Sequence, residues 1–138
     1  MRRRFEAIQS SLLATNGSSA SVFVPIVKYS GETGRCHPEA MSALGLKLVD
    51  ANMIDYEEDE GVTFDLYGGA KETDSVEIEL LLTGIMQDEI MQSVMIAQNG
   101  NIIAPYEGGF DIFSDRVDEI DGLRRLYPTW MSDRSDGL

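Results

Sequence analysis

The chain has 138 residues, 43% of them hydrophobic, and its 24 acidic and 11 basic side chains give a formal net charge of −13. This length is that of one typical domain, and the hydrophobic content is ordinary for a globular protein, so the acidity does not indicate disorder. The charge argues against direct nucleic-acid binding, because phosphates would be repelled.

The first third of the chain predicts a helix, a strand and a short helix. Residues 2–15 place apolar side chains at helical spacing. Residues 22–27 are β-branched and aromatic and predict a strand. Pro25 indicates an edge position or a bulge in that strand, because proline cannot donate to the ladder. A second, short helix is expected over residues 38–44.

The middle of the chain predicts an antiparallel meander of short strands. The candidate strands cover residues 46–49, 53–57, 62–67 and 76–82. In the last of these, Val76, Ile78 and Leu80 alternate with Glu77 and Glu79. Such alternation is typical of a sheet with one face in water.

The last third predicts helix, hairpin and helix. A helix is expected over 88–98, with Asn99-Gly100 as its C-terminal cap. Two strands over 102–104 and 110–113 are expected to pair as a hairpin. Ser114 is the expected N-cap of a final helix. The elements together predict a single α+β domain over residues 1–138, with a mainly antiparallel sheet and two or three helices packed on one face.

No targeting segment or membrane span is predicted. The basic start, Met1–Arg4, is followed by Glu6 and Gln9 where a signal peptide has an apolar stretch. No run approaches the roughly 18 apolar residues of a membrane-spanning helix. Cys36 is the only cysteine, so an intramolecular disulfide is excluded. We therefore expect a cytoplasmic protein that does not enter the membrane.

No catalytic, metal or cofactor site is predicted. Residues 55–61 are rich in acids, but the glycine falls one position late for a calcium-binding EF-hand loop, and Leu66 stands where that loop has glutamate. Cys36 and His37 are sequence neighbours, which seldom lets a nucleophile and a base face each other. The further ligands of a zinc site are missing as well.

The acidic side chains are the main candidates for a functional surface. Between Leu48 and Asp115, Lys71 is the only basic side chain. Six acids are predicted to form a partner-binding surface: Glu57, Glu58, Asp59, Glu60, Glu77 and Glu79. The alternative interpretation is that this acidic segment is only a solvated surface.

The C-terminal quarter carries a more distinctive pattern. Pro105–Ile112, with its Gly108-Gly109 pair, is followed by a helix and then by Leu126–Ser132, which contains the single tryptophan, Trp130. This resembles the tail of small, uncharacterised bacterial cytosolic proteins, some of them of immunity or antitoxin type. The resemblance implies no catalytic residues. In physical terms we expect Gly108-Gly109 to turn the hairpin and Trp130 to fold back over the last helix as an apolar anchor.

These observations favour a small protein that binds a basic protein partner as an immunity protein or inhibitor does. An acidic inhibitor associates rapidly with a toxin that is cationic at its active site, and a DNA mimic is a variant of the same idea. Two other classes stay open: a small enzyme or small-molecule-binding domain with an acid-lined pocket, and a self-associating phage or plasmid accessory protein. A homodimer is compatible with the sequence.

Overall fold

One antiparallel sheet organises the protein. The computed structural model describes residues 2–12, 19–28, 38–54, 62–87, 89–90, 94–106 and 108–130. Within these residues the sheet has six strands in the order β2-β3-β1-β4-β5-β6, and every neighbouring pair is antiparallel. The strands are β1 (Ser19–Lys28), β2 (Lys47–Ile54), β3 (Thr63–Glu72), β4 (Met95–Gln98), β5 (Asn101–Tyr106) and β6 (Gly109–Ser114).

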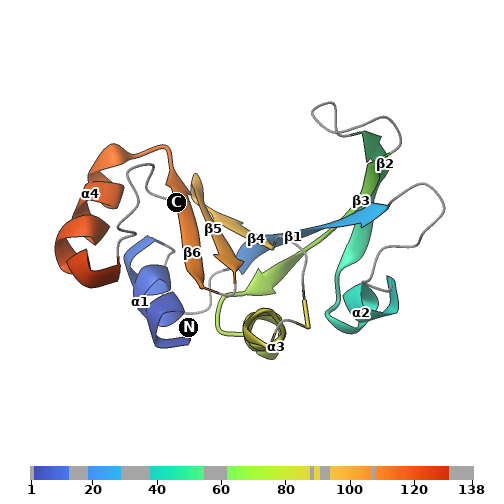
Figure 1. Ribbon diagram of the computed structural model, residues 1–138, viewed down its shortest axis with the longest axis horizontal. Helices are drawn as coiled ribbons and strands as arrows, with labels where there is room; N and C mark the ends of the chain where they lie inside the picture. Colours follow the sequence, from blue (N-terminus) through green and yellow to red (C-terminus); the bar gives the residue numbers. More distant parts are fainter. Residues whose placement is uncertain are drawn as a thin grey trace.

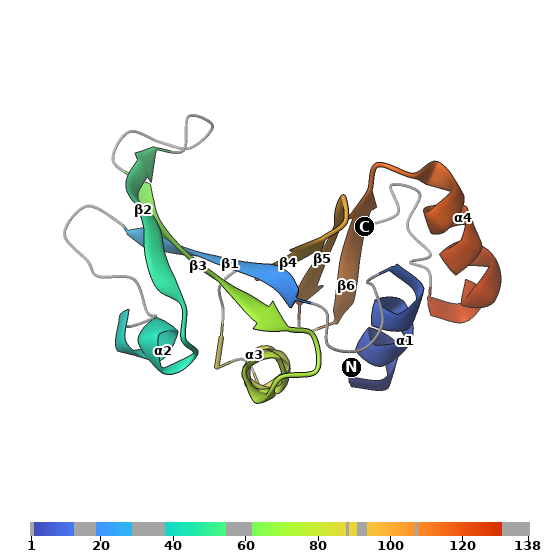
Figure 2. The same cartoon turned by 180° about the vertical axis from the view of Figure 1, so that it is seen from behind.

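The described residues also form four α-helices and one 3₁₀ turn. These are α1 (Arg2–Leu12), α2 (Pro38–Ala43), α3 (Val76–Met86), α4 (Val117–Leu126) and the 3₁₀ turn η1 (Pro128–Trp130). Figures 1 and 2 show α1, α2 and α3 along one face of a strongly curved sheet, with α4 beyond β6 and beside α1. The predicted α+β class with a mainly antiparallel sheet is confirmed, with four helices in place of the two or three expected.

The core lies between the sheet and the helices. Alternate residues of β1 are buried on the helix side, which is the period-2 pattern of a strand with one covered face. The helices bury side chains at helical spacing against them. The buried apolar side chains of β1, α1 and α3 are Ala20, Val22, Val24, Ile26, Phe5, Ile8, Leu12, Ile78, Leu81, Leu82 and Ile85.

Pro25 lies in an interior strand, at a place that behaves as an edge. β1 is not an edge strand, because it pairs with β3 along its whole length and with β4 on its other side. Among the described residues, the pairing of β1 with β4 runs from Ser21 to Phe23. Pro25 therefore lies beyond the segment paired with β4, where a missing N–H need not interrupt that ladder.

The predicted strand over 76–82 is wrong, because these residues belong to helix α3. Five residues of alternation resemble a strand, but Ile78, Leu81, Leu82 and Ile85 are all buried, and their spacing is that of one helix face. Ser75 begins the helix, since its side chain accepts a hydrogen bond from the Ile78 N–H.

The predicted helix over 88–98 is also wrong in the residues that the structure describes. Met95–Gln98 forms β4, which pairs with β5. Asn99 and Gly100 have φ values of 54° and 80°, as the two central residues of a type I′ hairpin turn require. The Asn-Gly pair thus turns a hairpin where we expected it to cap a helix.

Most other predicted elements are confirmed with shifted ends, but the two strands predicted over 46–49 and 53–57 are a single strand, β2, in the described residues. The helices at 2–15 and 38–44 correspond to α1 and α2, and the C-terminal hairpin to β5 and β6. Ser114 is not the N-cap, because α4 begins after Arg116. The Ser114 hydroxyl instead accepts a hydrogen bond from the Arg116 N–H at 3.0 Å.

Candidate functional site

Two of the six predicted partner-binding acids can be placed. Glu77 and Glu79 lie in the first turn of α3, on a helix and not on a sheet face. The other four, in the segment from Glu57 to Glu60, lie outside the described residues, as do Cys36, His37 and the whole of the calcium-like segment 55–61. The structure therefore bears on the acidic surface only around α3.

Glu77 has an evident structural role. Its carboxylate lies 3.8 Å from the Lys71 Nζ, and that lysine side chain is only 13% exposed. A carboxylate in the first turn of a helix also interacts favourably with the positive end of the helix dipole. The ion pair with Lys71 and the helix dipole thus account for an acidic residue at position 77 without a binding partner.

The outer face of α3 combines acidic and apolar side chains. Val76 is 63% exposed and Leu80, one turn later, is 53% exposed. Glu79 is exposed beside them, and so are Glu72 and Asp74 just before the helix. We call these five residues the acidic α3 face.

Acids from separate parts of the chain meet at the edge of this face. Glu6 of α1, Asp74 and Glu79 line one hollow of about 150 Å³ between α1 and α3. Phe5 and Met86 supply apolar walls to the same hollow. Tertiary packing therefore gathers carboxylates that the sequence keeps apart.

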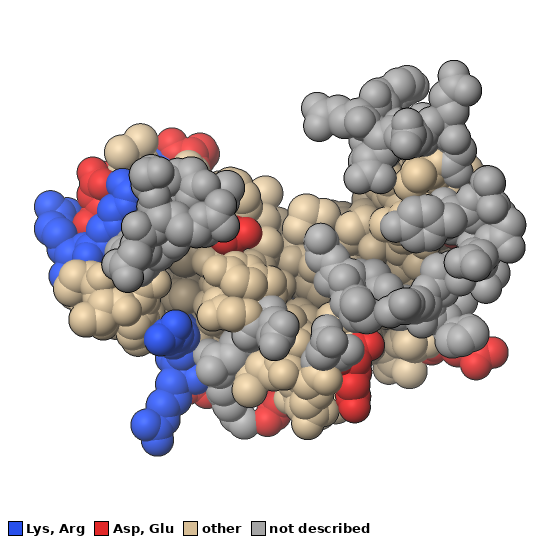
Figure 3. Space-filling view, in the orientation of Figure 1, with Lys and Arg blue, Asp and Glu red and all other residues tan. Residues whose placement is uncertain are grey.

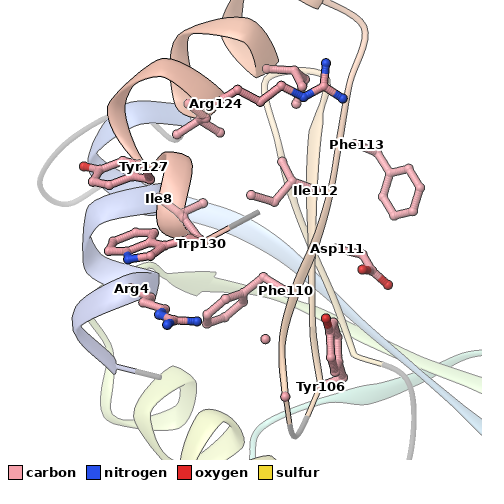
Figure 4. A pocket seen from close by; sticks show the side chains of 14 residues that line it. Arg4, Ile8, Tyr106, Phe110, Asp111, Ile112, Phe113, Arg124, Tyr127 and Trp130 are labelled. Carbon is pink, nitrogen blue, oxygen red and sulfur yellow. The ribbon is translucent and has the colours of Figure 1, made fainter. Parts of the chain in front are cut away.

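A larger pocket lies at the opposite side of α1, and the sequence did not predict it. It has a volume of about 370 Å³ and lies among α1, the β5–β6 hairpin, α4 and η1. We call it the arginine–aromatic pocket (Figure 4). It is lined by Arg4, Ile8, Tyr106, Gly108, Gly109, Phe110, Asp111, Ile112, Phe113, Ile120, Leu123, Arg124, Tyr127 and Trp130.

Aromatic rings fix the position of Arg4 in this pocket. Tyr127 and Trp130 stack with ring centroids 4.0 Å apart and planes 5° from parallel. The Arg4 guanidinium lies 5.4 Å from the centroid of Trp130, within the range of a cation–π interaction. Trp130 therefore does pack as an aromatic anchor, and it holds a cation of α1 as well as its stacking partner.

Arg124 is the second cation of the pocket. Its Nη1 lies 3.3 Å from the Asp121 Oδ1, in an exposed pair on the surface of α4. In the view of Figure 4, Arg4 and Arg124 lie at opposite ends, with Ile8, Ile112 and Trp130 between them. Asp111, the one acid among the described residues of the lining, points away from Arg4 and Trp130.

The glycine pair of the hairpin makes room for Tyr106. A Cβ on Gly108 would come within 3.0 Å of the Tyr106 ring, and one on Gly109 within 3.1 Å of its hydroxyl. The two glycines therefore have two roles. They form the turn, and they allow the Tyr106 side chain to lie close to the backbone at the wall of the pocket.

A buried amide ties together the elements that surround the pocket. Asn101 is fully buried in β5, and its Nδ2 donates to the Leu12 carbonyl of α1 at 2.9 Å and to the Glu119 carboxylate of α4 at 3.0 Å. Glu119 also pairs with Arg116 at 2.6 Å. One side chain thus fixes α1 and α4 relative to the sheet.

Charge is unevenly distributed over the molecule. Figure 3 shows lysine and arginine gathered over α4 and α1, with acids beside them on α4, whereas the charged side chains drawn along the edge over α3 and α2 are acids. The arginines at the start of α1 oppose the helix dipole, because the first turn of α1 has no acid and the dipole is positive there.

The described residues place no three His, Cys, Asp or Glu side chains together as a metal ion would need. Among the described helices, none is long and apolar enough to cross a membrane.

No curated protein and no solved structure matches the chain. A family model does match it over residues 3–135, which is nearly its whole length, and that family is described as "Domain of unknown function (DUF3885)". The chain therefore belongs to the DUF3885 family.

Proposed function

We propose that this protein acts in the cytoplasm by binding a basic protein partner through its acidic surface, as an immunity protein or inhibitor does. The observation that carries the proposal is the acidic α3 face, on which Val76 and Leu80 are exposed between acids. Protein interfaces combine an apolar centre with a polar rim. Val76 and Leu80 lie one turn apart on α3 and would supply such a centre, with Glu72, Asp74 and Glu79 exposed near them.

The acids of this face have a defined part in the proposal. At the rim of an interface, Glu72, Asp74 and Glu79 steer a cationic partner and accelerate association, while Val76 and Leu80 supply buried apolar contact. The segment from Glu57 to Glu60 is proposed to extend the same attraction, since it has the highest density of acids in the chain.

The acid-lined pocket that the alternative function needs has a small candidate among the described residues, the hollow of about 150 Å³ lined by Glu6, Asp74 and Glu79. The arginine–aromatic pocket contains, among its described residues, two arginines and one aspartate. A ligand of the arginine–aromatic pocket would thus be an anion, and it would bind at a different part of the molecule from the acidic α3 face.

The test compares two charge reversals of equal size. The first variant combines Glu72→Lys, Asp74→Lys and Glu79→Lys on the acidic α3 face. The control combines Asp115→Lys, Asp118→Lys and Asp121→Lys at and near the start of α4, all exposed in the structure. Both variants change the net charge equally, so a difference between them reports the location of the charge.

The measurement is capture of partners from lysate of the source cell, followed by association kinetics with the captured protein at low and high ionic strength. We expect a basic protein on the wild type and on the control, and at least tenfold slower association with the α3 variant, with a rate that falls as salt is added. Replacing Glu57, Glu58, Asp59 and Glu60 by lysine should slow association further. Equal association by both three-site variants would contradict the proposal. A wild type that captures only itself would favour the self-associating accessory protein.

A further inference from the structure

We propose that the arginine–aromatic pocket is a binding site for a small aromatic carboxylate. The site does not depend on the acidic α3 face, because none of the residues of that face lines it. Its volume of about 370 Å³ is within the range of small-molecule sites, which are mainly apolar with a few placed polar groups. The lining has that composition.

Arg4 is the main contact for the carboxylate. The cation–π interaction with Trp130 uses the flat face of the guanidinium, so the N–H groups at its edge stay available to a carboxylate. A cation that is held in place before the ligand arrives loses less conformational entropy on binding. Arg4 also belongs to the first turns of α1, where the positive end of the helix dipole adds to the attraction of an anion.

Arg124 is the second cationic contact, at the other end of the pocket. Its present partner, Asp121, lies on the same exposed helix surface, and such surface pairs contribute little to stability. The guanidinium has five N–H donors, so it can keep this pair and still bind a ligand. Asp111 also lines the pocket, but its side chain points away from Arg4 (Figure 4).

The apolar floor and the net charge narrow the class of ligand. Phe110 lies beside Arg4 and Ile112 lies between the two arginines (Figure 4), and the buried Ile8 and Leu123 also line the pocket. These side chains suit a flat apolar ring. A single negative charge suits the site better than the near-double charge of a phosphate monoester, because the protein as a whole carries −13.

The test uses the isotope-labelled full-length chain and follows backbone amide and Trp130 indole signals by NMR. The probes are phenylacetate, its neutral counterpart phenylacetamide, the aliphatic carboxylate butyrate, and phenyl phosphate. Arg4→Gln and Arg124→Gln remove one pocket cation each. Arg3→Gln and Arg125→Gln are the matched controls, since both are exposed neighbours on the same helices and neither lines the pocket.

We expect phenylacetate to give saturable shifts at Gly108, Gly109 and Trp130. Phenylacetamide, butyrate and phenyl phosphate should each bind at least tenfold more weakly. Arg4→Gln should weaken phenylacetate binding about 10- to 100-fold, as loss of a hydrogen bond to a charged group does, and the two controls less than threefold. Arg124→Gln does not touch Trp130, so it tests the site even where Arg4→Gln alters the fold.

Three results would overturn the proposal. The first is equal binding of phenylacetate and phenylacetamide, which would make the pocket merely apolar. The second is an equal effect of the pocket variants and their controls on phenylacetate binding, which would mean that any nearby arginine attracts the anion and that the pocket does not bind it specifically. The third is the absence of phenylacetate binding together with protection of β6 amides by an acidic peptide, which would make the pocket a groove for an added strand.

Discussion

At the scale of single residues, Asn101 is the side chain on which the arrangement of elements most depends. Its amide donates to one carbonyl at the end of α1 and to one carboxylate of α4, both from a fully buried position. Replacing it by aspartate keeps the size and removes both donors. We expect Asn101→Asp to lower the free energy of unfolding by about 3 kcal/mol or more. The buried aspartate oxygen would then face the Leu12 carbonyl and the Glu119 carboxylate, which are hydrogen-bond acceptors as well.

The companion variant Asn101→Ala removes the hydrogen bonds without adding a charge, so it separates the two effects that are combined in Asn101→Asp. It should cost about 1–3 kcal/mol, the usual consequence of leaving buried partners unpaired. Thr83→Ala, on the exposed side of α3, is the control and should change stability by less than about 0.5 kcal/mol. Chemical denaturation measures all three. Were Asn101→Asp as stable as the wild type, the amide would not hold α1 and α4 in the way described.

At the scale of elements, two neighbouring leucines distinguish helix from strand over 76–82. In a strand with Val76, Ile78 and Leu80 inward, Leu80 would be buried and Leu81 exposed. In α3 the order is reversed, since Leu81 is fully buried and Leu80 is 53% exposed. We expect Leu81→Ala to cost about 2–5 kcal/mol and Leu80→Ala less than about 0.5 kcal/mol, measured by urea unfolding. A larger loss of stability for Leu80→Ala than for Leu81→Ala would contradict the helix and favour a strand over these residues.

The same element shows what a sequence of this length can predict. The helix of α1 and the β5–β6 hairpin were predictable because their patterns are local and long enough to be unambiguous. The pattern of residues 76–80 is compatible with the period of a strand and with that of a helix. The burial of Leu82 and Ile85, which follow, fits only the helix. Asn99-Gly100 is likewise ambiguous, since the pair suits a hairpin turn and a helix cap.

The arginine–aromatic pocket was beyond prediction for a different reason. Arg4 and Trp130 lie near opposite ends of the chain, and their contact exists only because α1 packs beside α4. No local pattern encodes such a meeting. The resemblance in the C-terminal quarter did single out Tyr106, Phe110 and Trp130, but it indicated a structural role and gave no partner for them.

At the scale of the whole molecule, the excess of acids should make stability depend on ionic strength. A net charge of −13 repels itself, and salt screens that repulsion. Raising sodium chloride from about 10 to 200 mM shortens the Debye length from roughly 30 Å to below about 10 Å. We expect the free energy of unfolding to rise by about 1 kcal/mol, or roughly 4 °C in the thermal midpoint.

The competing effect is the screening of attractive pairs, and it decides what would contradict this expectation. The described ion pairs of Arg116 and Arg124 are partly or largely exposed, so each contributes little and their weakening by salt is small. Potassium chloride should act like sodium chloride, because screening follows ionic strength and not the identity of the cation. Combining Glu72→Gln with Glu89→Gln, both exposed, moves the net charge from −13 to −11 and should reduce the gain. A midpoint that falls with salt, or a gain unchanged in the double variant, would mean that local pairs and not net repulsion govern the stability of this acidic fold.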